Sequence, residues 1–323
     1  MRIGTPRNDT KNMRHIPVLP NEITDLLQPK PNQNFIDCTL GDAGHAEMIL
    51  GKTSPNGKLL GIDADPESLL RAKQYLYQFG ERVVYARDNF VNLTKIVAEN
   101  NFGPVNGILL DLGWSSPQFS ERGRGFSFEK DEPLDMRYQG KSESQNPKSE
   151  TTIETASEIV NHYHEEELAR IFKTYGEENL SKEIAAAIVA SRKKQPIERT
   201  SQLVEIILEV YQKKLHSTKQ IPWIGGLHPA TKVFQALRIE VNHELEILQQ
   251  ALPQAVEILC SGGHLAVISF HSLEDRIVKH YFTSIQNKLI KLVNKKPITA
   301  SEEEIKRNPR ARSAKLRVVE KMM

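Results

Sequence analysis

The sequence predicts an α/β fold in which a doubly wound, mostly parallel sheet is interrupted by an inserted helical segment. Two observations support this prediction. Apolar runs typical of strands alternate with helical patterns between residues 35 and 113. The next strand-like run, 263–270, lies much farther along the chain than the roughly dozen residues that a crossover connection needs. Apolar residues at helical spacing occupy 151–211, so we expect helices to fill the interval.

Each element of this fold follows from its local pattern. Residues 15–20 are expected to be extended because two prolines oppose a helix there, and Asn21 is expected to cap a short helix ending at Leu27. The run 106–113 is apolar nearly throughout, which is typical of a strand buried on both faces. Two C-terminal runs suit an antiparallel hairpin at the sheet edge. The expected strands are 35–40, 58–63, 82–87, 106–113, 263–270, 288–295 and 315–321.

Composition and charge narrow the class of protein. Of 323 residues, 39% are hydrophobic and 26% are charged, and the net charge of +2 gives no argument for nucleic-acid binding. Cys38 and Cys260 lie in or beside apolar stretches, so we expect buried thiols in a reducing compartment. Residues 1–14 are polar and are expected to be a disordered leader, not a secretory signal. No run approaches the roughly 20 apolar residues of a membrane span, so we expect a cytoplasmic protein.

A strand, a glycine-containing turn, a helix and a second strand that ends in an acid follow one another from residue 35, which is the layout of a nucleotide-type cofactor site. Gly41 and Gly44 form a G-x-x-G turn and are expected to let the backbone approach a ligand. A pyrophosphate needs several backbone N–H groups, so this sparser turn suits S-adenosylmethionine (SAM), which has no phosphates. Asp63 is placed to accept hydrogen bonds from two ribose hydroxyls. The alternatives are an ordinary tight turn and, for Asp63, the N-cap of a helix at Pro66.

Further candidate residues come directly after the next strands. Phe90 is placed to contact an adenine, although a core position is the simpler explanation for a single phenylalanine. Asp111 ends the fourth strand beside the switch point of the sheet, where the transferred group would meet the substrate. Gln118 adds an amide nearby. The segment 269–276 contains Ser, His and Asp, but it lacks a G-x-S-x-G elbow, so it is expected to be an active-site wall and not a hydrolase triad.

Two weaker features can each be interpreted as a plain solvated surface or as a binding site. His162 and His164 lie two residues apart and would not share a helix face, which favours a solvated helix junction and no metal site. Residues 306–313, with Lys315 and Arg317, form a basic cluster in a nearly neutral chain. This cluster is either a solvated face or a surface that contacts nucleic-acid phosphates.

Taken together, these motifs resemble the bacterial ribosomal RNA small-subunit methyltransferase H family, also called the MraW family. The matching stretches run in order along nearly the whole chain, which makes the resemblance specific. They are 15–19, 37–45, 61–66, 107–113, 115–118, 122–128, 133–137, 174–178, 228–231, 234–239, 268–276 and 308–313. Two positions depart from the usual pattern: Ala43, where the family has glycine, and Trp114, where it has a small aliphatic residue.

The resemblance implies the Rossmann-like class I SAM-dependent methyltransferase fold and N4-methylation of a cytidine in the decoding region of 16S rRNA. It also implies that the 30S subunit or a late precursor is the substrate, while a homodimer stays open. We expect the methyltransferase domain at 15–137 and 217–323 and the helical insert at 138–216. The SAM-binding positions that the family implies are Ala43, Gly44, His45, Asp63, Phe90, Asp111 and Gln118.

The exocyclic amine of cytosine is a poor nucleophile because its lone pair is delocalised into the ring. The base must therefore be extruded and N4 aligned with the methyl group. We expect Asp111 to anchor the cofactor and polarise the amine, and Trp114 or Phe126 to stack on the base. His271 and Asp135 are further catalytic candidates because they lie in segments that flank the pocket.

Two other classes of function stay open at this point. One is a NAD-linked oxidoreductase on the same fold, which the incomplete glycine pattern disfavours. The other is a non-catalytic ribosome assembly factor that keeps SAM as a structural ligand.

Overall fold

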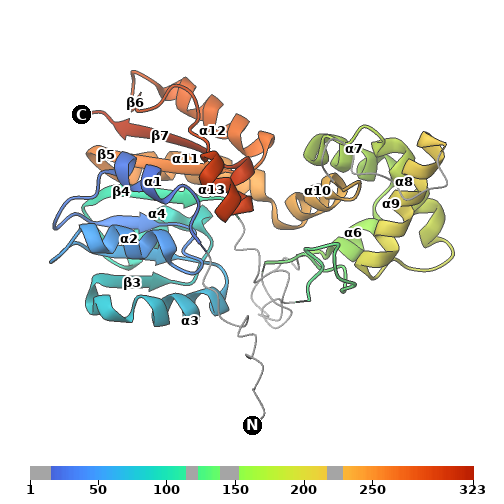
Figure 1. Ribbon diagram of the computed structural model, residues 1–323, viewed down its shortest axis with the longest axis horizontal. Coiled ribbons are helices and arrows are strands. Elements are labelled where there is room, and N and C mark those ends of the chain that lie inside the picture. Colours follow the sequence, from blue (N-terminus) through green and yellow to red (C-terminus); the bar gives the residue numbers. More distant parts are fainter. Residues whose placement is uncertain (1–15, 114–122, 139–152, 217–227) are drawn as a thin grey trace, which may run out of the picture. The chain divides into compact units, whose positions relative to one another are not determined.

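The computed structural model describes residues 16–113, 123–138, 153–216 and 228–323 (Figure 1). Contacts divide the chain into two compact units: unit 1 within Met1–Ser115 and Leu252–Met323, and unit 2 within Ser116–Ala251. The predicted leader, Trp114 and Gln118 lie outside the described residues. Every helix in the described ranges is too short or insufficiently apolar to cross a membrane.

Unit 1 contains a seven-stranded sheet with the order β3-β2-β1-β4-β5-β7-β6. Strands β1 to β5 pair in parallel, whereas β7 is antiparallel to both β5 and β6. The predicted doubly wound sheet with an antiparallel edge is confirmed, and its arrangement is Rossmann-like. The order reverses between β1 and β4, so the carboxyl ends of these strands flank the switch point. The strands are β1 (Phe35–Asp37), β2 (Leu59–Ile62), β3 (Val83–Ala86), β4 (Val105–Asp111), β5 (Leu259–Ser269), β6 (Ile290–Leu292) and β7 (Lys315–Lys321).

Helices α1, α2 and α3 join the sheet through one hydrophobic cluster, to which they contribute Ile23, Ile49 and Leu69. The start of α1 differs from the prediction. Pro20 is the first helical residue, a position that suits its fixed φ, and Leu19 rather than Asn21 precedes the helix as N-cap. The helices are α1 (Pro20–Leu27), α2 (Gly44–Lys52), α3 (Pro66–Tyr75), α4 (Leu93–Glu99), α11 (Glu244–Ile258), α12 (Ser272–Ile285) and α13 (Glu302–Arg307), with short 3₁₀ turns at η2 (Tyr77–Arg82), η3 (Phe90–Asn92) and η4 (Pro309–Ser313).

Unit 2 has a separate hydrophobic core, built mainly from helices. His162 ends α6 and His164 is the N-cap of α7, and both side chains are exposed, so the pair lies at a helix junction. The helices are α6 (Ala156–His162), α7 (Glu165–Gly176), α8 (Ser181–Arg192), α9 (Thr200–Leu215) and α10 (Thr231–Asn242).

The compact helical unit is larger than the insert expected at 138–216. Leu134 is buried in the core of unit 2, and its backbone N–H donates to the Glu198 carbonyl at 2.8 Å. Val233 and Leu237 of α10 belong to the same core. The described residues on both sides of the expected insert therefore pack with the helices, because their apolar side chains complete that core.

Candidate functional site

The turn between β1 and α2, which we call the cofactor loop (residues 37–45), depends on left-handed backbone conformations. Gly41 has a φ of 50°, and Ala43 has φ 59° and ψ 27°. An L-residue in this conformation costs roughly 1 kcal/mol, which glycine avoids. The Ala43 N–H donates to the Leu40 carbonyl at 2.7 Å and closes the turn. This geometry explains why a glycine suits the position that Ala43 occupies here.

The structure gives a reason for glycine at position 44 that the sequence did not indicate. A Cβ at this position would lie 3.1 Å from the ring of Pro17. The backbone of the cofactor loop is therefore closely packed against the segment that precedes α1. Close approach of a ligand stays a prediction for Gly44, and the contact with Pro17 is a second reason for a glycine at this position.

Asp63 connects the end of β2 to the cofactor loop. One carboxylate oxygen accepts the Gly41 N–H and the other accepts the Asp65 N–H, both at 2.9 Å. The N-cap of α3 is Asp65, whose side chain accepts the Glu67 and Ser68 N–H groups at 3.2 Å each, so Asp63 is not the cap. Each carboxylate oxygen has a second lone pair, and the half-buried Asp63 can therefore also accept ribose hydroxyls.

Asp111 and His45 face each other across the switch point. The Asp111 backbone N–H donates to Thr39 Oγ1 at 2.8 Å, and its Oδ1 accepts the Gly113 N–H at 3.1 Å. Its other oxygen lies 3.6 Å from His45 Nε2. The His45 side chain is buried, and neither ring nitrogen has a hydrogen-bond partner among the described residues. A buried imidazole with two unsatisfied nitrogens is costly, which favours a polar ligand at this point.

Asp37 lies at the base of the same site. It is 2% exposed, and its Oδ1 accepts the Thr39 N–H at 3.1 Å. Burial raises the pKa of Asp37 to about 7; His45 and the Thr39 N–H act to lower the pKa, while Asp111 and Asp63 add to the rise. Several acidic groups therefore converge on the cofactor loop, and this surrounding fits a cationic cofactor such as SAM.

Phe90 opens η3, just after β3. The Asn89 side chain accepts the Val91 N–H at 3.0 Å and fixes this turn. The Phe90 ring is half-buried and belongs to neither hydrophobic cluster of the described residues. The half-buried ring leaves part of its surface accessible, which fits the expected contact with a ligand ring.

Replacement of Phe90 by alanine should weaken SAM binding about tenfold or more, because stacking on a base contributes roughly 1–3 kcal/mol. Thermal stability should change less than it would for a fully buried phenylalanine, since the ring is only half-buried. Isothermal titration of SAM provides the measurement, and Phe90→Tyr, which keeps the ring, is the matched control. Equal SAM affinity for the alanine variant and the wild type would refute the adenine contact.

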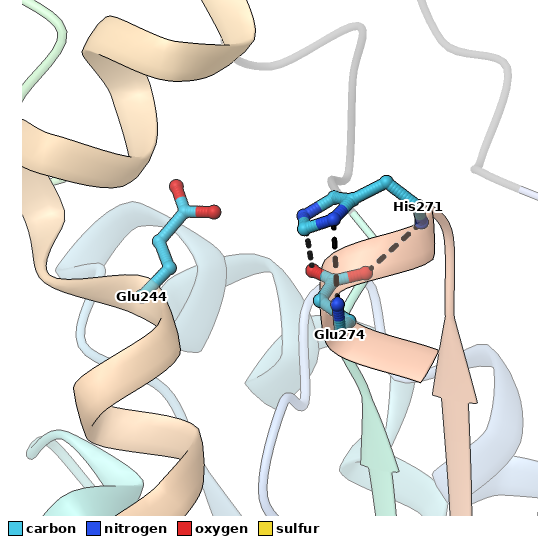
Figure 2. Close-up of side chains that lie close together, drawn as sticks. All are labelled: Glu244, His271 and Glu274. Atoms are coloured by element: carbon cyan, nitrogen blue, oxygen red, sulfur yellow. Dashed lines mark hydrogen bonds and ion pairs between the residues drawn. The ribbon is translucent and has the colours of Figure 1, made fainter. Parts of the chain in front are cut away.

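His271 has a clear role in the turn between β5 and α12 (Figure 2). It is the N-cap of α12, its Nδ1 accepts the Glu274 N–H at 3.4 Å, and its Nε2 lies 3.1 Å from Glu274 Oε1. Glu274 is buried, and its Oε2 accepts the backbone N–H groups of Phe270 and His271 at 2.8 and 3.2 Å. These contacts hold the segment that the sequence predicts as an active-site wall.

Asp135 and Phe126 belong to unit 2. The Asp135 carboxylate accepts two hydrogen bonds from the Arg137 guanidinium, at 2.7 and 2.8 Å, and this pairing raises the pKa of Arg137. Phe126 stacks on Tyr138 with ring centroids 5.9 Å apart. Both side chains therefore have partners within unit 2 that stabilise their own segment.

Sequence reasoning placed Asp37 and Thr39 in the matching stretch 37–45 but did not single out either residue for the site. Their spacing carries a signal, because an Asp side chain that accepts the N–H two residues later is a common local turn. The hydrogen bond from Asp111 to Thr39, across 72 positions of the chain, has no such local signal.

Comparison with known proteins yields matches along the whole chain. The family model described as the MraW methylase family matches residues 12–322. The ribosomal RNA small subunit methyltransferase H of Heliobacterium modesticaldum is 44% identical over 95% of this chain and 98% of its own length. The protein of the same name from Geobacter sp. is 43% identical over 97% of this chain and 100% of its own length. Among solved structures, an rRNA methylase from Streptococcus thermophilus is 10% identical, with a TM-score of 0.40 and coverage of 94% of both chains.

Proposed function

Because this chain belongs to the MraW methylase family, we propose that it transfers a methyl group from SAM to N4 of one cytidine in the decoding region of 16S rRNA. The broader activity, SAM-dependent methylation of rRNA, is that of the family. The observation that supports the site best is the acidic end of the sheet, where Asp37 and Asp111 lie around the buried, unsatisfied His45.

The cofactor-binding residues in this proposal come from four neighbouring strand ends. When bound, SAM supplies a methyl group activated by a positively charged sulfur. The carboxylates give the pocket a negative potential that favours this charge, and His45 gains a polar partner. Asp63 would hold the ribose and Phe90 the adenine. The full set is Ala43, Gly44, His45, Asp63, Phe90, Asp111 and Gln118.

Asp111 is the proposed catalytic residue. One oxygen is held by the Gly113 N–H, so the direction of the carboxylate is fixed. The Asp111 side chain is 16% exposed, and the oxygen that faces His45 would accept a hydrogen bond from the N4 amine of an extruded cytosine. This bond would orient the amine lone pair and stabilise the positive charge that develops on nitrogen during transfer.

The other catalytic candidates have supporting roles in this proposal. Trp114 or Phe126 would stack on the extruded base. His271 would keep the β5–α12 wall in place through Glu274, and Asp135 would keep its segment in place through Arg137.

We further propose that the substrate is the 30S subunit or a late precursor of it, in the cytoplasm, and that the helical unit, centred on the expected insert 138–216, takes part in RNA contact. A homodimer is a second possibility for the assembly, which sedimentation of the purified protein would test.

Mass spectrometry of 16S rRNA from a strain that lacks the gene tests the proposed function. Loss of one N4-methyl group from a decoding-region cytidine, restored by the wild-type gene, is the expected result. An unchanged methylation pattern would instead indicate a non-catalytic assembly factor. Titration of the purified protein with SAM and with NAD separates the methyltransferase from an oxidoreductase on the same fold.

A further inference from the structure

Two segments at opposite ends of the sequence meet beside the cofactor loop. Residues 16–19 precede α1, and Glu304 and Asn308 belong to α13 and the residue after it. Glu304 Oε1 accepts the backbone N–H of Leu19 at 2.7 Å. The Asn308 side-chain amide donates to the Ile16 carbonyl at 3.1 Å. We call these two hydrogen bonds, with residues 16–19, the clasp.

The clasp holds a strained piece of backbone. Leu19 has φ 54° and ψ 45°, a left-handed conformation that L-residues rarely adopt. Its side chain is fully buried in the same hydrophobic cluster as Ala43 and Ala311. Such a conformation persists when its surroundings determine it, and the hydrogen bond to Glu304 is one of those determinants.

The clasp contacts the cofactor loop directly. Pro17 lies between the two clasped residues, Ile16 and Leu19, and its ring is packed so closely on Gly44 that a Cβ there would lie 3.1 Å away. Gly44 is the first residue of α2, and the next residue is His45, whose ring faces Asp111. The position of residues 16–19 therefore determines how far the start of α2 can move.

We propose that Glu304 and Asn308 are positioning residues for methyl transfer: they hold residues 16–19 against Gly44 and thereby keep the cofactor loop in its SAM-binding geometry. This inference rests on the proposed function only in taking SAM as the ligand of the loop. Neither residue touches the cofactor in this scheme, since both act through Pro17 and Gly44.

Matched variants of Glu304 test the first bond. Glu304→Ala removes the acceptor of the Leu19 N–H, and we expect the Kd and the KM for SAM to rise about tenfold, while kcat and the KM for the RNA substrate stay within about twofold. Glu304→Gln keeps Oε1 and should bind SAM within about twofold of the wild type. Glu303→Ala changes an exposed neighbour on the same helix and is the control for charge.

Asn308→Asp tests the second bond, because it replaces the amide donor to the Ile16 carbonyl with an acceptor. The expected result is the same rise in the Kd for SAM with unchanged kcat. The proposal is overturned if Glu304→Ala and Asn308→Asp bind SAM as the wild type does, or if Glu304→Gln loses affinity as fully as Glu304→Ala. Titration with SAM alone needs no RNA, so a wild type that binds SAM but leaves 16S rRNA unmethylated would refute the proposed function without affecting this test.

Discussion

Replacement of Asp111 by asparagine is expected to leave the protein folded and to lower the turnover of rRNA methylation about a hundredfold or more. Asparagine has nearly the same shape and keeps an oxygen for the Gly113 N–H. The substitution replaces the negatively charged oxygen, which faces His45 and the proposed amine site, with an uncharged amide group. Single-turnover methylation of 30S subunits from the deletion strain, with SAM in excess, measures the chemical step.

The control for this prediction is Asp25→Asn, which removes an exposed carboxylate from α1. Its turnover should equal that of the wild type. Titration with SAM then separates the two roles of Asp111, because loss of turnover with retained binding assigns it to catalysis. Near-normal turnover of a folded Asp111→Asn variant would exclude the catalytic role.

Replacement of Asp37 by asparagine is expected to raise the free energy of unfolding by a few kcal/mol at pH 8 and by progressively less toward pH 4. The pKa of Asp37 is about 7 in the folded protein, compared with its ordinary value of 3.8, chiefly because the side chain is buried. Between these two values the folded state binds a proton that the unfolded state has lost. Stability from this group is therefore greatest below about pH 4, falls as the pH rises, and stays low above pH 7.

Asparagine is neutral at every pH and keeps an oxygen for the Thr39 N–H. The variant therefore does not lose stability at this position as the pH rises. Urea denaturation of both proteins at pH 5 and pH 8 measures the effect, and the difference between the two proteins cancels the contributions of all other groups. A difference that does not depend on pH would show that Asp37 does not titrate in this range. The variant should also bind SAM more weakly at pH 8, because a negative charge near the cation is lost.

Much of the fold can be predicted from local patterns. The strand at 106–113 is recognisable because apolar residues fill a short run, and the structure has β4 at Val105–Asp111. The candidate cofactor residues were recognisable for a related reason: Asp63 and Asp111 are carboxylates at the ends of apolar strands, where charged side chains are uncommon. In a parallel sheet such strand ends share one edge, so neighbouring strands bring their residues together.

Features that depend on distant partners were not predictable. The limits of the helical unit were missed because Leu134 and Val233 could fill either core by their sequence pattern, and the structure assigns them to unit 2. The start of α1 was missed because Asn21 is a common capping residue, whereas Leu19 takes the N-cap position and its backbone N–H donates to Glu304 Oε1.

The sequence by itself determined the class of fold, the presence of a helical insertion after the fourth strand, the turn between β1 and α2 and the acids at the strand ends, because these features depend on the period of apolar residues and on the residue types at the end of each strand. The tertiary structure alone decided which groups face one another: His45 and Asp111, Gly44 and Pro17, and the clasp between the two ends of the chain. Such pairings depend on how far apart folded elements lie in space, and a linear pattern carries no record of that distance.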